Sequence, residues 1–350
     1  MQSYLPFEIK YSPIQKIALV SFEKCPDIIY RELELLYVNG EPYGTGYRVI
    51  AYRNDDYIDM YDDKALNFIR NEKFNVIGKG LNKHVQTEIN NTVFSRKDNK
   101  QTISFEFTDV ENRQIKVYIE EKSNKQTFPM NTLAPIGMSA VRPNCLPVFF
   151  MYNFDFIRQN QTVIACDIAG KEILPDKFPI PMFGQPRLYT RFSNDCELIE
   201  FAKTDDDFLK EVELDEKNVY RDEHVEYVFE EENALQSVIV HFARNDVQIH
   251  FTPSLDLNKD GSGEFTIQPS EEMGYLKGIF EIRTGQETRV VMEPKYGWIS
   301  NPSNFFTKMI LGKRSIFHKW SKQYKYESVI DWETKTITAS WKNSNIEENS

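Results

Sequence analysis

The residues whose types could do chemistry gather in an aromatic stretch framed by prolines, residues 148–192. It contains a run with the alternation of a β-strand, in which residues two apart share a face. Five side chains lie on one face of that run: Phe150, Tyr152, Phe154, Phe156 and Arg158. Aromatic walls with a few polar groups are typical of pockets for small, largely apolar ligands, although aromatic side chains also dominate ordinary cores. We predict that these five residues bind such a ligand, together with Tyr189 and Arg191 of a second alternating run.

Asp155, on the other face of the first run, raises the alternative of an enzyme. A buried carboxyl group with a raised pKa can act as general acid or base, and Arg191 or Tyr189 could stabilise charge beside it. Such a set would act on a small apolar molecule or a carbohydrate. The sequence has no G-x-S-x-G elbow, phosphate loop or dinucleotide-binding motif that would locate a reaction. We therefore expect a non-catalytic or weakly catalytic binding protein without a cofactor. A protein–protein interaction module is the third hypothesis.

One segment resembles the start of a calcium-binding loop. Asp256, Asn258 and Asp260 occupy its first, third and fifth positions and precede Gly261. The twelfth position is Ile267, where calcium requires a bidentate carboxylate, and the flanking residues have strand character. The pattern therefore favours a hairpin loop in which Asn and Asp side chains stabilise turns.

His241 and His250 form the other candidate metal site, because they bracket Asn245-Asp246. A tight turn at these two residues would place the imidazoles opposite each other, about 5 Å apart, across a hairpin. Two histidines can begin a metal site, but the sequence identifies no third ligand. We expect a surface pair and no bound metal.

The composition restricts the partners and the location. The chain has 350 residues, a net charge of −11 and a pI near 5.2, and a negative field repels the phosphates of nucleic acid. Its four cysteines form neither a zinc pattern nor a disulfide framework, which favours reduced thiols. No signal peptide and no apolar stretch long enough to span a membrane are found. We expect a soluble, cytoplasmic protein that binds no nucleic acid.

Short strands separated by turn residues dominate the pattern, and they predict a mainly β protein. Helices are expected at three places only: 62–74, the acidic segment after Thr204, and 303–325. The length favours two domains. We predict an N-terminal β domain at 1–195, an acidic connection at 196–233, a C-terminal β domain at 234–342 and a disordered tail at 343–350.

The predicted architecture is two tandem antiparallel β-barrels or β-sandwiches. Each half is a meander of strands interrupted by one helix. A helix packed on a barrel and followed by a last strand is similar to the arrangement in lipocalin-like proteins, of which tandem forms have about this length. The resemblance is one of fold and rests on no sequence motif.

Overall fold

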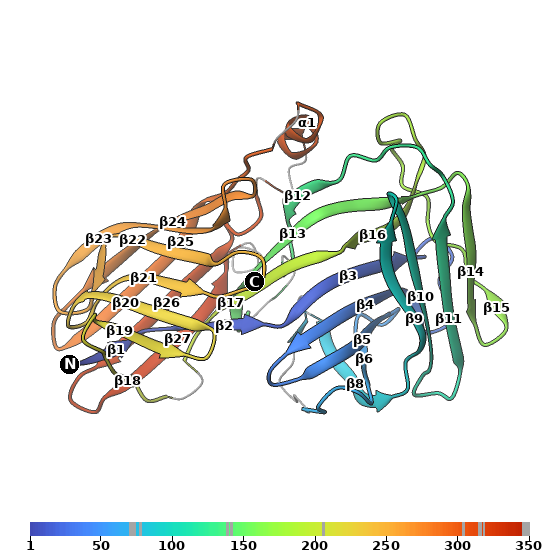
Figure 1. The fold of residues 1–350 in the computed structure, drawn as a ribbon. Coiled ribbons are helices and arrows are strands. Elements are labelled where there is room, and N and C mark those ends of the chain that lie inside the picture. Colours follow the sequence, from blue (N-terminus) through green and yellow to red (C-terminus); the bar gives the residue numbers. More distant parts are fainter. Residues whose placement is uncertain are drawn as a thin grey trace. The chain divides into compact units, whose positions relative to one another are not determined.

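The computed structural model describes residues 1–69, 75–76, 79–137, 140, 143–204, 207–302, 305–313, 317 and 319–344. Within these residues nearly every element is a β-strand, and the strands form several sheets (Figure 1). The mainly β fold predicted from the sequence is therefore confirmed. In the part of the chain described here, every helix is too short or too polar to cross a membrane.

The chain divides into two compact units, each assembled from segments that are not consecutive. Unit 1 comprises Met1–Ser12, Thr132–Phe150 and Leu198–Ser350, and unit 2 comprises Pro13–Asn131 and Met151–Glu197. The consecutive domains expected from the sequence, 1–195 and 234–342 with a connection at 196–233, stay a prediction that limited proteolysis can test.

The first sheet of unit 2 curls into a half-barrel. Its strands, in spatial order, are β16 (Arg187–Ser193), β3 (Ile14–Ser21), β4 (Tyr30–Gly40), β5 (Gly44–Arg53), β6 (Ile58–Asp63), β8 (Lys79–Thr87) and β7 (Asn75–Val76). The second half of β13 (Cys145–Arg158) pairs with β16. Neighbours are antiparallel except for β6 and β8, which run parallel.

The second sheet of unit 2 packs on one face of the first. Its strands, in spatial order, are β15 (Lys171–Glu172), β14 (Thr162–Ile168), β11 (Gln114–Glu121), β10 (Lys100–Thr108) and β9 (Asn90–Lys97). In Figure 1 the long strands of this sheet run across the direction of β3, β4 and β5. Apolar side chains from both sheets, such as Leu33, Ile103 and Ile119, form one buried cluster. Each contributes roughly 1.5–3 kcal/mol by burial.

Unit 1 is built on a sheet that, in its described residues, has nine antiparallel strands. In chain order they are β19 (Val219–Asp222), β20 (Val225–Glu231), β21 (Ala234–Val240), β22 (Val247–Asp256), β23 (Gly261–Ser270), β24 (Gly274–Arg283), β25 (Glu287–Ile299), β26 (Tyr324–Asp331) and β27 (Thr336–Asn343). Rings of Phe7, Phe201, Tyr326 and Trp341 lie edge to face or tilted in its core, with centroids 4.5–6.5 Å apart, the geometry that aromatic pairs prefer.

The remaining strands come largely from the chain's N-terminal part and its middle. They are β1 (Gln2–Leu5), β2 (Glu8–Ser12), β12 (Met130–Leu133), β17 (Asp195–Ala202) and β18 (Lys210–Glu213). β1 pairs with β18, and β2 pairs with the end of β17. In each of these two strand pairs, the paired residues lie about 190 to 210 positions apart in the sequence.

Of the three predicted helical segments, one contains a helix in the described residues. The helix α1 (Phe305–Lys313) lies within the predicted segment 303–325. The helix expected after Thr204 is wrong in its described part, because Lys210–Glu213 is the strand β18, whose backbone bonds with Gln2–Leu5 outweigh local helix propensity. The helix predicted at 62–74 is wrong in its described part, because residues 62–69 contain the end of β6 and turns. Residues 70–74, and residues 345–350 of the predicted tail, lie outside the described residues.

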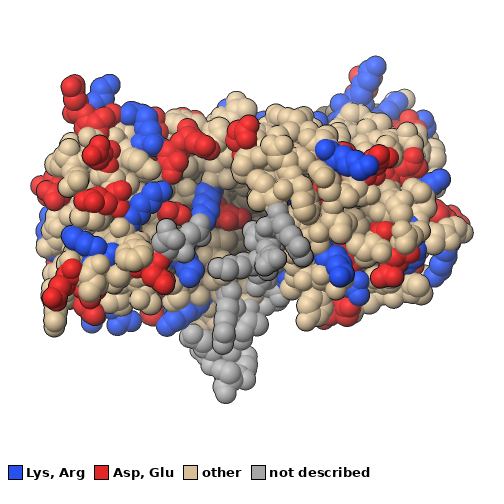
Figure 2. Space-filling view, turned by 90° about the horizontal axis from the view of Figure 1, so that it is seen from below, with Lys and Arg blue, Asp and Glu red and all other residues tan. Residues whose placement is uncertain are grey.

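On the face shown in Figure 2, Lys and Arg side chains are interspersed with Asp and Glu, and neither sign forms one continuous patch there.

Candidate functional site

The candidate site lies on the face of the half-barrel sheet that points away from the five-stranded sheet. Strand alternation separates the two faces: Leu33 and Leu35 enter the cluster between the sheets, whereas Glu34 and Leu36 lie on the opposite side. We call this opposite side the Glu34 face. The register aligns one row of side chains across it: Phe156, Arg191, Leu19, Glu34, Ile50, Met60 and His84.

Two glutamates from β4 and an arginine from β16 form the polar centre of the Glu34 face. The guanidinium of Arg191 donates to the carboxylate of Glu32, and the two side chains are 27 % and 12 % exposed. Glu34 is buried, and the hydroxyl of Tyr52 donates to its Oε2 at 2.8 Å. The centre is therefore more open to solvent at Arg191 than at Glu34, which is 7 % exposed.

Burial is the main cause of the raised pKa values of Glu34 and Glu32. Loss of hydration raises the pKa of Glu34 to about 7, and the charge of Glu32 adds to the effect, whereas the hydrogen bond from Tyr52 opposes it. Burial also raises the pKa of Glu32, and the nearby Arg191 offsets only part of that rise. A carboxyl group that titrates near neutral pH is suited to proton transfer or to switching its hydrogen bonding.

An aromatic group adjoins the polar centre. The guanidinium carbon of Arg191 lies 4.6 Å from the ring centroid of Tyr189, a cation–π contact. The ring of Tyr189 stacks on that of Phe178, with an interplanar angle of 6°. The ring centroids of Phe156 and Phe178 are 4.4 Å apart. Tyr189 and Phe178 are half-buried, so their rings offer apolar surface beside hydrogen-bonding groups.

Asp155 does not join this site. In the register of β13 and β16 it pairs with Phe192, which belongs to the core between the two sheets, whereas Phe156 pairs with Arg191. Asp155 is buried, and Arg187 Nη2 lies 3.7 Å from its Oδ1. Burial raises its pKa, against the opposing effect of Arg187. The structure thus places Asp155 on the opposite face of the sheet from Tyr189 and Arg191.

The five predicted ligand-binding residues of β13 do not form one group either. Phe154 and Phe156 contact each other, with ring centroids 5.3 Å apart, and Phe156 belongs to the Glu34 face. Phe150 and Tyr152 are fully buried, and Tyr152 donates to Glu197. A positive φ at the exposed Asn153 interrupts the alternation between Tyr152 and Phe154.

Arg158 is a structural residue. Its Nε and Nη2 each donate at 2.9 Å to the carboxylate of Glu121, and both side chains are buried. The backbone N–H groups of Arg158 and Gln101 also donate to Glu121. The bidentate pair is fully engaged within the protein and offers no group to a ligand.

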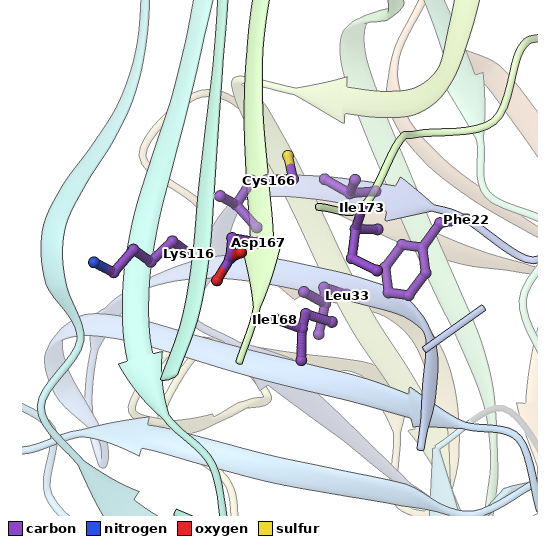
Figure 3. Close-up of a pocket in the computed structure, with 9 residues that line it drawn as sticks. Phe22, Leu33, Lys116, Cys166, Asp167, Ile168 and Ile173 are labelled. Carbon is purple, nitrogen blue, oxygen red and sulfur yellow. The ribbon is translucent and has the colours of Figure 1, made fainter. Parts of the chain in front are cut away.

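A small cavity lies between the two sheets of unit 2 (Figure 3). Its walls are mostly apolar and include Phe22, Leu33, Cys166 and Ile173, and the side chain of Lys116 extends away from them. The cavity volume is about 10 Å³, enough for roughly one water molecule. It is too small for a ligand of the predicted kind.

The residues of the calcium-like pattern engage partners within the protein. Asp256 lies 2.7 Å from Lys259 Nζ, Asn258 hydrogen-bonds to Asn233, and Asp260 accepts bonds from Thr284. They lie in the β22–β23 hairpin, as the turn interpretation predicts.

The two candidate histidines do not face each other. Val240 pairs with Val247, and Ser237 pairs with His250. His241 therefore lies in the loop between β21 and β22 and is not opposite His250. His241 Nδ1 lies 3.0 Å from Asp246 and His250 Nε2 lies 3.0 Å from Gln248. Among the described residues, no three His, Cys, Asp or Glu side chains converge to hold a metal ion.

Of the residues in this candidate site, the sequence singled out Tyr189 and Arg191 but not Glu32, Glu34 and Tyr52. The alternation Glu32-Leu33-Glu34-Leu35 was the available signal, and it is normally that of a strand with one solvated face. Comparisons with protein-family models, curated proteins and solved structures found no match. The function must therefore be argued from the site itself.

Proposed function

We propose that the chain is a binding protein for a small, largely apolar ligand with a polar group, held on the Glu34 face beside Tyr189 and Arg191. The observation that carries the proposal is the combination of half-buried apolar surface with buried hydrogen-bonding groups. Leu19 lies in register between Arg191 and Glu34, and it is itself half-buried. A few polar groups within an apolar lining are characteristic of small-molecule sites.

The apolar part of the ligand would lie against the strands that flank this row. Ile14, Ile17 and Leu19 of β3 are partly buried and pack against the buried Leu36 and Ile50. The aromatic rings of Tyr189 and Phe178 extend the same surface towards the loop before β16. The ligand would thus gain most of its affinity from apolar contact and its orientation from Arg191, Glu32 and Glu34.

The proposal extends to the type of barrel and to the location. The curled half-barrel sheet leads us to include a lipocalin-like barrel in the proposal, because lipocalin barrels hold one small ligand. The four cysteines, all described, are free thiols, and two of them, Cys166 and Cys196, are buried. Free thiols favour a reducing compartment such as the cytoplasm.

Native mass spectrometry of protein from a rich host tests the proposal. We expect a stoichiometric adduct that is released on denaturation and identified as a small apolar molecule. Tyr189→Ala should weaken the affinity for the released molecule roughly fivefold or more, because a ring contact of this kind is worth on the order of 1 kcal/mol or more.

Tyr118→Ala is the matched control, since Tyr118 is an exposed tyrosine on the five-stranded sheet. It should leave the adduct unchanged. A clean unliganded mass, with no thermal shift across a lipid and metabolite panel, would refute small-molecule binding and shift the weight to a protein–protein interaction module.

An enzyme is the second candidate, and Glu34 rather than Asp155 would be its acid or base. The pKa of about 7 favours this role. If a reaction occurs, Glu34→Gln should retain binding while the bound molecule recovered from it differs from that of the wild type. Identical molecules from both proteins would leave Glu34 a binding residue only.

A further inference from the structure

Close to Glu34, Arg191 is paired with Glu32, whereas Glu34 itself is hydrogen-bonded to a neutral group. The groups that face it are Glu32 on its own strand, Tyr52 on β5 and Arg191 on β16, with the apolar Leu19 between them on β3. The buried thiol of Cys196 on β17 also lies close enough for the charge of Glu34 to raise its pKa, and this thiol is neutral. Arg191 donates to Glu32, which leaves that pair with no net charge. Among the described residues, the hydrogen-bond partner of Glu34 is the neutral hydroxyl of Tyr52.

A buried carboxyl group without a cation of its own is most stable in its neutral form. In that form it carries an O–H donor in addition to the oxygen that accepts from Tyr52. The ion pair of Arg191 and Glu32 beside it contributes no net charge. The polar centre is therefore neutral overall when Glu34 is protonated and carries one negative charge when Glu34 is ionised.

We infer that the ligand is uncharged and presents a hydrogen-bond acceptor, such as a carbonyl oxygen, to the protonated carboxyl group of Glu34. The inference rests on the proposed function and specifies the class of ligand. A ligand carboxylate would meet two glutamate side chains and only one arginine, already bonded to Glu32. A ligand cation would gain an attractive partner only after Glu34 loses its proton.

The same arrangement makes binding depend on pH. Ionisation of Glu34 removes the donor and leaves two acceptors facing each other in a poorly hydrated site, which is repulsive. Since the pKa of Glu34 is about 7, the affinity for a neutral acceptor should fall as the pH rises through neutrality. Glu32 is held by Arg191 on the side of the site that is open to solvent.

Three probes with similar alkyl chains and different head groups test the inference: decan-2-one, decanoate and decylammonium. Their dissociation constants for the wild type are measured by calorimetry at about pH 6 and about pH 8.5. We expect decan-2-one to bind best at the lower pH and to lose roughly tenfold or more in affinity at the higher pH. Decanoate should bind more weakly than decan-2-one at the lower pH.

Two variants separate the roles of the glutamates. Glu34→Gln keeps a neutral side chain with a donor, so its affinity for decan-2-one should vary less than about twofold over the same pH range. Glu32→Gln is the matched control on the same strand face. It frees Arg191 from its ion pair and should improve decanoate binding roughly tenfold, because a guanidinium binds a carboxylate through a bidentate fork.

The outcomes distinguish the inference from the function on which it rests. If decan-2-one binds with the same affinity at both pH values, or if Glu34→Gln keeps the wild-type pH dependence, the inference is wrong while ligand binding stands. If decanoate binds best to the wild type, the ligand class is wrong. If none of the three probes binds at either pH and purified protein carries no adduct, the proposed function itself fails.

Discussion

Two buried glutamates of unit 2, Glu121 on the five-stranded sheet and Glu34 on the half-barrel sheet, illustrate two uses of the same side chain. Glu121 reaches into the interior between the sheets and accepts hydrogen bonds from both Nε and Nη2 of Arg158 and from two backbone N–H groups. Glu34 lies on the half-barrel sheet, on the face that points away from this interior, and Tyr52 donates to it. Both side chains are less than a tenth exposed.

The difference shows how burial alone fails to indicate function. A fully hydrogen-bonded ion pair fixes a structure, because every donor and acceptor is already used within the protein. A buried carboxyl group with a single neutral partner retains hydrogen-bonding capacity and a proton affinity near neutral pH. Glu121 thus belongs to the scaffold, and Glu34 is the group that can respond to pH and, under the proposed function, to a ligand.

The largest effect is expected from breaking the scaffold pair. Glu121→Leu leaves the guanidinium of Arg158 buried without a counter-charge and should lower the free energy of unfolding by about 3–5 kcal/mol. Urea denaturation measures the loss. The double variant Glu121→Leu with Arg158→Leu should recover much of it, because no unpaired charge remains. An unchanged stability in the single variant would contradict the structural role of the pair.

A smaller effect, with a distinct pH dependence, is expected at Glu34. Its carboxyl pKa rises from 4.5 to about 7 on folding, so the native state favours the protonated form. The associated stability is fully present below about pH 4.5 and is lost as the pH rises through about 7. The loss is on the order of 3 kcal/mol.

Urea denaturation at several pH values checks this dependence. Glu34→Gln has no proton to lose, so it should lack this part of the loss, while titration of all other groups remains common to both proteins. Parallel stability profiles for the two proteins would show that Glu34 does not titrate in this range.

The smallest effect concerns the hydroxyl that contacts Glu34. Tyr52→Phe should cost about 1 kcal/mol at pH values where Glu34 is protonated and about 2 kcal/mol where it is ionised, since bonds to charged groups are stronger. Tyr118→Phe is a matched control, because Tyr118 donates to Glu120 at the exposed surface. It should cost less than about 0.5 kcal/mol at any pH. Equal costs for the two variants would remove the distinction between the buried and the exposed pair.

Much of the fold could be predicted from local patterns. Strand alternation and turn residues indicated short strands joined by turns, and the structure has such hairpins, for example β4 with β5 and β26 with β27. The strand β18 was missed because its pairing partner, β1, lies far away in the sequence and leaves no local trace. Long-range pairing likewise produced units assembled from interleaved segments, which composition shifts along the chain do not reveal.

The sequence pointed to the candidate site only where a single segment carried its residues. Tyr189 and Arg191 stood out because they lie in an aromatic, proline-framed stretch. Glu32 and Glu34 looked like the solvated face of an ordinary amphipathic strand, and only the three-dimensional register places them beside Arg191. The same register separates Asp155 from that face, so adjacency in sequence was misleading there.

The pairing of the N-terminal strand has a consequence for synthesis on the ribosome. The backbone of Tyr4 in β1 hydrogen-bonds to Asn233, 229 positions later. At roughly 5–20 residues per second, this partner is made about 10 to 50 s after the strand itself. The segments of unit 2 are complete by Glu197, so they can fold while β1 still waits. During that interval the nascent chain presents an unpaired strand edge, and a chaperone that covers it would raise the yield of correctly folded protein.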